Sequence, residues 1–80
     1  MSYNDIFDKV TELLASQLPV DKAVMKPESR MIEDLGADSA NIMILICDVE
    51  NEFNITVDND VLGRIVTVDD LVKYLEQEIK

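Results

Sequence analysis

The sequence predicts an all-α fold, a small four-helix bundle with three longer helices, one short third helix and a long first loop. Three segments repeat their apolar residues with the three-and-four spacing of a helix that faces a core. No segment alternates apolar and polar residues as a half-buried strand would. The 80 residues predict a single domain, 1–80, close to the lower size limit for a core without disulfides or metals.

The first helix is predicted from about Tyr3 to Leu18. Ser2 and Asp5 have the spacing of a capping box, with Asp in the place of the usual Glu. Pro19 should end the helix, because the residue before a proline is biased away from helical geometry. The apolar residues on its core-facing side are Ile6, Phe7, Val10, Leu13, Leu14 and Leu18.

The stretch 19–37 shows no clear period and contains several turn formers, which predicts a loop that wraps around the bundle. A loop of this length is unusual in so small a domain and is often functional. One helical turn is expected near Ile32–Leu35.

The segment from Leu35 to Phe53 predicts the second helix, and either Asp38 or Ser39 can serve as its N-cap. Its apolar residues fall into two stripes. Because a surface helix needs only one such stripe, the second predicts either burial on two sides or a docking surface that begins beside Ser39. The core-facing stripe is Ile42, Leu45, Ile46, Val49 and Phe53, and the second stripe is Ala40, Met43, Ile44 and Cys47.

Two further helices are predicted after residue 57. Asp58 is expected to cap a short helix that carries Val61, Leu62 and Ile65. A calcium loop that starts at Asp58 would need a glutamate at its twelfth position, where Asp69 stands, so no metal site is predicted.

The last helix is predicted to open with a capping-box pair, Thr67 and Asp70. Its narrow apolar stripe runs almost to the end of the chain and consists of Val68, Leu71, Val72, Leu75 and Ile79.

The charge balance is strongly acidic, with 17 acidic against 7 basic side chains and a formal net charge of −10. Nucleic acid and anionic membrane surfaces repel such a chain, so neither is an expected partner, whereas proteins with Lys/Arg patches attract it. Simple solubility is the alternative explanation of the charge. One cysteine and no histidine exclude an intramolecular disulfide and effectively exclude thiolate–imidazole metal sites. Without a long apolar run or a recognisable leader, the chain is expected to be cytoplasmic, with no membrane insertion.

Ser39 is the residue that points to function. The chain has no histidine to act as its base and no glycine-rich phosphate loop, so an enzyme is not predicted. The start of a helix does favour a phosphate group, because free amides and the helix dipole meet there. Ser39 could therefore carry a covalent phosphoryl group or serve only as a cap, and the residues alone favour the cap.

The sequence is similar to the acyl carrier protein family over nearly its whole length. The resemblance runs through Leu-Gly-Ala-Asp-Ser at 35–39, Glu50-x-Glu52-Phe53-x-Ile55 and Thr-Val-Asp-Asp-Leu at 67–71. It implies that Ser39, after Gly36 and Asp38, bears 4′-phosphopantetheine, whose terminal thiol holds acyl groups as thioesters. The chain would then be a discrete acyl carrier for fatty-acid, polyketide or related lipid synthesis. Two alternatives remain: an aminoacyl or peptidyl carrier, against which Asp38 argues, and an unmodified helical interaction module.

The resemblance also implies partners, which are a phosphopantetheinyl transferase and acyl-transfer and synthase enzymes with basic patches, and a monomeric state. The predicted partner-facing residues are Ala40, Met43, Ile44, Cys47 and Asp48. A hollow between the helices would shelter the acyl chain, lined by Leu45, Ile46, Val49, Phe53, Val61, Leu62, Leu71 and Leu75.

Three positions depart from the family pattern on the partner-facing side. Ala40 replaces a usual leucine, Asn41 stands where aspartate is frequent, and Ile44 stands where an acidic residue is common. Because these changes flatten and neutralise that side, they predict a specialised carrier rather than the housekeeping one.

Overall fold

The computed structural model describes residues 2–79. Within them no strand forms, and one isolated antiparallel bridge pairs Arg30 with Thr67. The predicted all-α fold with three longer helices, a short third helix and a long first loop is confirmed. The elements in order are α1 (Tyr3–Gln17), the 3₁₀ helix η1 (Lys22–Val24), α2 (Ser39–Phe53), α3 (Asn59–Leu62) and α4 (Val68–Glu78).

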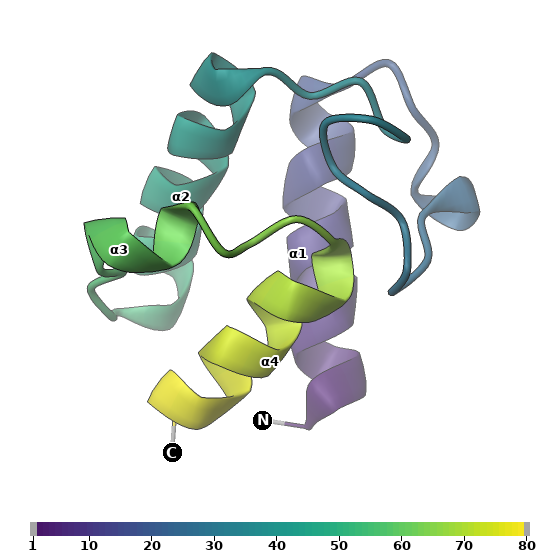
Figure 1. The fold of residues 1–80 in the computed structure, drawn as a ribbon. Helices are drawn as coiled ribbons and strands as arrows, with labels where there is room; N and C mark the ends of the chain where they lie inside the picture. Colours follow the sequence, from purple (N-terminus) through teal and green to yellow (C-terminus); the bar gives the residue numbers. More distant parts are fainter. Residues whose placement is uncertain (1, 80) are drawn as a thin grey trace.

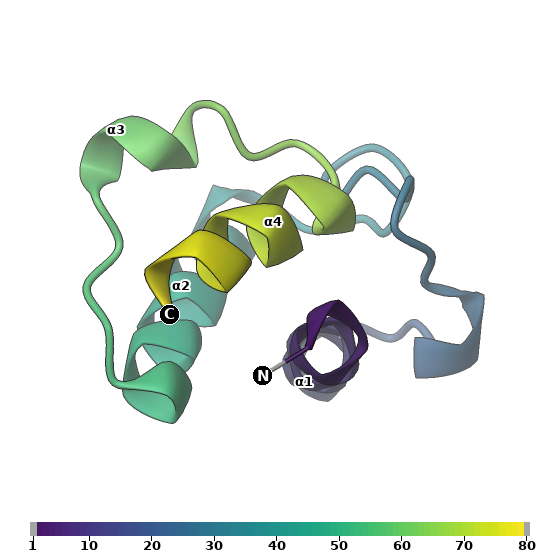
Figure 2. The same ribbon diagram turned by 90° about the horizontal axis from the view of Figure 1, so that it is seen from below.

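The first helix, α1, is the centre of the bundle. It packs against α2 on one side and α4 on another, and η1 also contacts it (Figure 1). Seen from below, α3 stands outside this group, at the end of extended connections (Figure 2). Within residues 2–79, α3 makes no close backbone approach to another helix. The bundle is therefore three packed helices with α3 as an outlying element.

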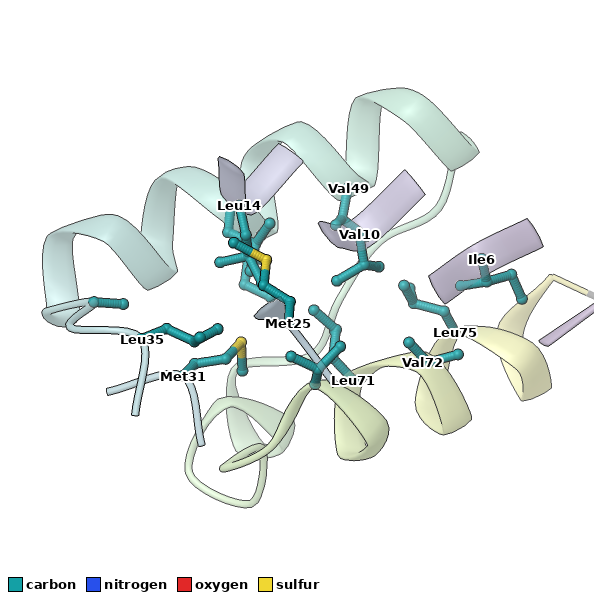
Figure 3. Close-up of a cluster of buried hydrophobic side chains, with 14 of the residues drawn as sticks. Ile6, Val10, Leu14, Met25, Met31, Leu35, Val49, Leu71, Val72 and Leu75 are labelled. Atoms are coloured by element: carbon teal, nitrogen blue, oxygen red, sulfur yellow. The ribbon is translucent and has the colours of Figure 1, made fainter. Parts of the chain in front are cut away.

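The core forms where the apolar stripes of these three helices meet (Figure 3). In α1, Ile6, Val10 and Leu14 recur every four residues and are fully buried, as the helical period predicts. Each such side chain contributes about 1.5–3 kcal/mol by leaving water. Their fully buried partners on the other two helices include Leu45, Val49, Leu71 and Leu75.

The long loop is held to this core by Met25, Met31 and Leu35, which are buried. Its backbone also bonds to the start of α4, since the amide of Met31 donates to the Val66 carbonyl at 3.0 Å. One feature differs from the prediction, since the 3₁₀ helix η1 was not expected. The expected helical turn near Ile32–Leu35 is an isolated turn in which the Asp34 amide donates to the Arg30 carbonyl at 2.8 Å.

Helix boundaries follow side-chain caps in three of the four capping predictions, those for α1, α2 and α4. Ser2 with Asp5 and Thr67 with Asp70 form the predicted capping boxes of α1 and α4. Asp58 lies at the N-cap position of α3 but makes no side-chain cap hydrogen bond, so the prediction that it caps this helix is wrong. The four-residue α3 therefore lacks the stabilisation that a cap gives its neighbours.

Candidate functional site

The loop enters α2 through a turn that needs glycine. Gly36 has a φ of +78°, in the left-handed region that other residues rarely adopt. An added Cβ would meet nothing within 4 Å, so the requirement is conformational and not steric. After this turn, Asp38 lies in an extended conformation at the N-terminal end of α2.

Asp38 is the N-cap of α2, which decides between the two candidates left open by the sequence. Its Oδ1 accepts the Asn41 amide at 2.9 Å, and Asn41 Oδ1 accepts the Asp38 amide at 3.1 Å. The pair is a capping box in which Asn41 takes the role usually given to Glu or Gln. Ser39, between them, is the first residue of the helix and its hydroxyl is not needed for capping.

Ser39 is exposed to solvent at the positive end of a 15-residue helix. Within residues 2–79, its hydroxyl and the backbone amides of Ser39 and Ala40 make no hydrogen bond. Free amides of this kind, with the helix dipole behind them, favour a negatively charged group. The site can therefore accept a phosphate on the Ser39 oxygen without breaking an existing contact.

The start of α2 is also tied to the end of α1. Asn41 Nδ2 lies 3.3 Å from Gln17 Oε1. With its amide turned over, Gln17 instead donates to the Asn41 carbonyl at 3.2 Å and accepts from the Leu45 amide at 3.3 Å. In both orientations Gln17 bonds to Asn41, so the turn that presents Ser39 is anchored to the central helix.

A groove of about 310 Å³ opens beside Ser39, between α2 and the segment that follows α3. Its surface is mainly apolar, and Ser39 lies on its wall. The lining residues are Met31, Ile32, Ser39, Ile42, Met43, Leu62, Gly63, Ile65 and Val66. An acyl chain attached near Ser39 would find here a place out of water.

The predicted acyl-pocket residues lie elsewhere, with Leu62 as the one exception. Five of them are buried in the packed core: Leu45, Ile46, Val49, Leu71 and Leu75. Phe53 is half-buried against that core, and Val61 lines a separate, more polar cavity of about 650 Å³ with Tyr74 and Glu78. The structure thus gathers most of the predicted set in the core and builds the groove from other residues.

The sequence-based reasoning missed these groove residues for an identifiable reason. Ile32, Gly63 and Val66 lie in turns and connections, where no helical period marks them, and Ile65, which was predicted to lie in the short third helix, lies beyond the end of that helix at Leu62. The available signal was the run of apolar residues around Gly63 outside any clear helix.

The second stripe of α2 is exposed. Ala40 and Cys47 face solvent, and Met43 and Ile44 keep 51% and 50% of their surface. Asp48 beside them is half-buried. The alternative of burial on two sides therefore does not hold for this stripe, and the role of this surface in docking stays a prediction.

Most carboxylates of α2 are engaged within the chain. Glu50 Oε2 accepts the Val57 amide at 2.8 Å and so fixes the turn after α2. Glu52 pairs with Lys9 of α1 at 3.3 Å, and this hydrogen bond raises the pKa of Lys9. Together with the capping Asp38, three of the four carboxylates at 38–52 already have partners in the protein.

The described part of the chain holds no group of three or more potential ligands that could bind a metal ion. None of its helices is both long and apolar enough to cross a membrane.

Comparisons with known proteins point to one family. The family model for the phosphopantetheine attachment site matches residues 8–75. An acyl carrier protein of Thermotoga maritima is 40% identical over 78 residues, covering 98% of this chain and 96% of that protein. One from Wolinella succinogenes is 41% identical over 71 residues, or 89% of this chain and 93% of its own length. Among solved structures, the acyl carrier protein from Enterococcus faecalis superposes with a TM-score of 0.82 at 22% identity, over 98% of this chain and 99% of its own, which supports the fold.

Proposed function

The chain belongs to the acyl carrier protein family, and we propose that Ser39 is the residue that bears its 4′-phosphopantetheine. As a member of this family it carries acyl groups and is not itself a catalyst. The observation that carries the proposal is the position of Ser39, exposed at the first turn of α2 immediately after the capping Asp38. Fatty-acid synthesis is the usual role of the family, and we propose it, with related lipid synthesis, as the setting.

The residues around Ser39 fit the phosphopantetheine group. The free amides of Ser39 and Ala40 suit its phosphate, and Asp38 holds the helix end so that the serine hydroxyl stays exposed. When bound, the group supplies the thiol on which acyl chains are held as thioesters.

The groove beside Ser39 supports the proposal that the protein shelters the acyl chain that it carries. A chain that entered the predicted core pocket would have to displace Leu45, Val49 and Leu75, which are fully buried and already packed. The groove needs no such displacement and begins at Ser39 itself. We therefore place the acyl chain in the groove in preference to the core.

The partners of the family are transferase and synthase enzymes. For this chain they would be a phosphopantetheinyl transferase and acyl-transfer enzymes with basic patches, which a net charge of −10 attracts over long distances. We propose that residues 1–80 form one carrier domain that works as a monomer in the cytoplasm. Exposed Met43 and Ile44 support a specialised partner set.

Loading tests the assignment of Ser39. The unmodified protein is incubated with coenzyme A and a phosphopantetheinyl transferase, and its intact mass is measured. One phosphopantetheine should add to the wild type and none to Ser39→Ala, which removes no cap and should fold normally. The matched control is Ser16→Ala, since Ser16 is also an exposed serine but lies in α1 with its hydroxyl bonded to the Leu13 carbonyl. Addition to Ser39→Ala would refute the assignment.

A further inference from the structure

A second hollow adjoins the groove beside Ser39. Its volume is about 270 Å³, and its surface is mainly apolar. The residues that it shares with the groove are Ile32, Leu62, Gly63, Ile65 and Val66. Only the groove reaches Ser39, and only the second hollow reaches Arg30 and Glu33 in the loop before α2. The two spaces are therefore neighbours, with Ser39 at the wall of one and the ion pair of Arg30 with Glu33 at the wall of the other.

The groove by itself holds only a chain of medium length. A water molecule occupies about 30 Å³ of liquid and a methylene group is of similar size, so the 310 Å³ of the groove accommodates about ten carbons. A longer chain that stays in the groove leaves its remaining methylenes in water, where they lack the stabilisation that burial gives. The second hollow is a neighbouring apolar space that can take them.

Gly63 borders both spaces, and its backbone does not require glycine. It is the C-cap residue of α3, and glycine is common after helices because the chain often turns left-handed there. The φ of Gly63 is −72° and its ψ is −13°, a helical conformation that other residues adopt freely. An added Cβ would meet no atom within 4 Å, so close packing does not require glycine either. What remains is the space that a side chain would fill where the groove and the second hollow adjoin.

We propose that Gly63 sets the length of acyl chain that this carrier shelters, because its missing side chain joins the groove and the second hollow into one binding space. This rests on the proposed function, since the chain must be attached through Ser39. Chains of up to about ten carbons occupy the groove alone, and longer unbranched chains pass Gly63 into the second hollow. The exposed ion pair of Arg30 with Glu33 marks the far limit, because covering charged side chains with an apolar chain is unfavourable. The cargo class is thus a long unbranched acyl group.

The test follows the position of the chain by NMR in the full-length protein. A transferase loads Ser39 with phosphopantetheine that carries an acyl group of eight or of sixteen carbons, and intact mass confirms the loading. The backbone amide signals of Ile42 and Met43, which line only the groove, should shift with both chains. The signals of Arg30 and Glu33, which line only the second hollow, should shift with sixteen carbons and stay in place with eight.

Gly63→Leu should close the passage, and the open space around Gly63 admits the new side chain. With sixteen carbons, this variant should lose the signal shifts at Arg30 and Glu33. Arg64→Leu is the matched control, because it places the same side chain one residue later, at an exposed position that lines neither space. In the wild type and the control, the sixteen-carbon form should melt at a higher temperature than the eight-carbon form. In Gly63→Leu the two forms should melt alike, and this comparison within one variant removes any effect of the substitution itself on stability.

Two results would overturn the proposal. One is a wild type in which the signals of Arg30 and Glu33 do not respond to sixteen carbons, and the other is a response that persists in Gly63→Leu. In both cases the acyl mass found on Ser39 would leave the proposed function intact. A protein that gains no acyl mass at Ser39 would instead refute the proposed function, and the role of Gly63 would fall with it.

Discussion

Replacing Asp38 by alanine tests how the start of α2 is held. Asp38→Ala removes the oxygen that accepts the Asn41 amide at 2.9 Å, whereas the backbone amide of residue 38 can still donate to Asn41 Oδ1. Losing an N-cap acceptor costs about 1 kcal/mol, and losing an anion at the positive helix end adds about 0.3–1 kcal/mol. The free energy of unfolding should therefore fall by about 1–2 kcal/mol. In a domain of this size each kcal/mol lowers the melting temperature by about 4–8 °C.

Asp58→Ala is the matched control, measured with Asp38→Ala by thermal unfolding followed by circular dichroism. Asp58 also occupies an N-cap position but makes no side-chain cap hydrogen bond. Both variants remove one negative charge, so any relief of charge repulsion is common to them. Asp58→Ala should stay within about 0.5 kcal/mol of the wild type, and Asp38→Asn, which keeps an acceptor, should largely retain stability. Equal melting temperatures for Asp38→Ala and Asp58→Ala would refute the role of the capping box.

Three further outcomes are expected. The amides of Thr67 and Val66 hold the pKa of Asp70 below its usual value, so the stability that this carboxylate contributes is complete above pH about 4 and is lost as the pH falls through its lowered pKa. Asp70→Asn should accordingly flatten the loss of stability in acid, measured by urea unfolding at several pH values. Burial, followed by a hydrogen bond to Asp69, raises the pKa of Tyr3 to about 12, and an absorbance titration should show a phenol with this pKa that Tyr3→Phe removes. Raised salt, or millimolar Mg²⁺ or Ca²⁺, should increase the melting temperature by screening a net charge of −10, and a flat response would mean that the acidic groups are too far apart to repel.

The helical bundle could be predicted because its apolar residues recur along the sequence at the spacing of a helix. The spacing of Ile6, Val10 and Leu14 specifies a buried face, and the capping pairs of α1 and α4 mark where those helices begin. The predicted end of α1 differs by one residue, Gln17 in place of Leu18, because Pro19 fixes the boundary only approximately. The 3₁₀ helix η1 was missed, since three residues are too few to show a period.

The candidate site could be predicted only where it depends on residues that are close together in the sequence. The position of Ser39 at the first turn of α2 depends on its neighbours in sequence, Gly36 and Asp38. For this reason the sequence alone could indicate it. The groove depends on the distance between segments that are far apart in the chain, such as Met43 and Val66. Helical period shows which side of α2 faces inward, but not whether the space beside it is filled. For this reason Leu45 and Val49 were assigned to a cavity and are found in the packed core.

The two sides of the groove differ in how firmly they are built. Ser39, Ile42 and Met43 belong to a capped 15-residue helix that is anchored to α1. Leu62 ends a four-residue helix that has no side-chain cap and no buried residue. Local unfolding free energies are lowest where buried contacts are few, so backbone amides at 59–62 should exchange with deuterium much sooner than those of α2. We therefore expect the α3 side of the groove to move more readily than the α2 side, which would let the volume of the groove adjust to the length of the acyl chain that we propose it holds.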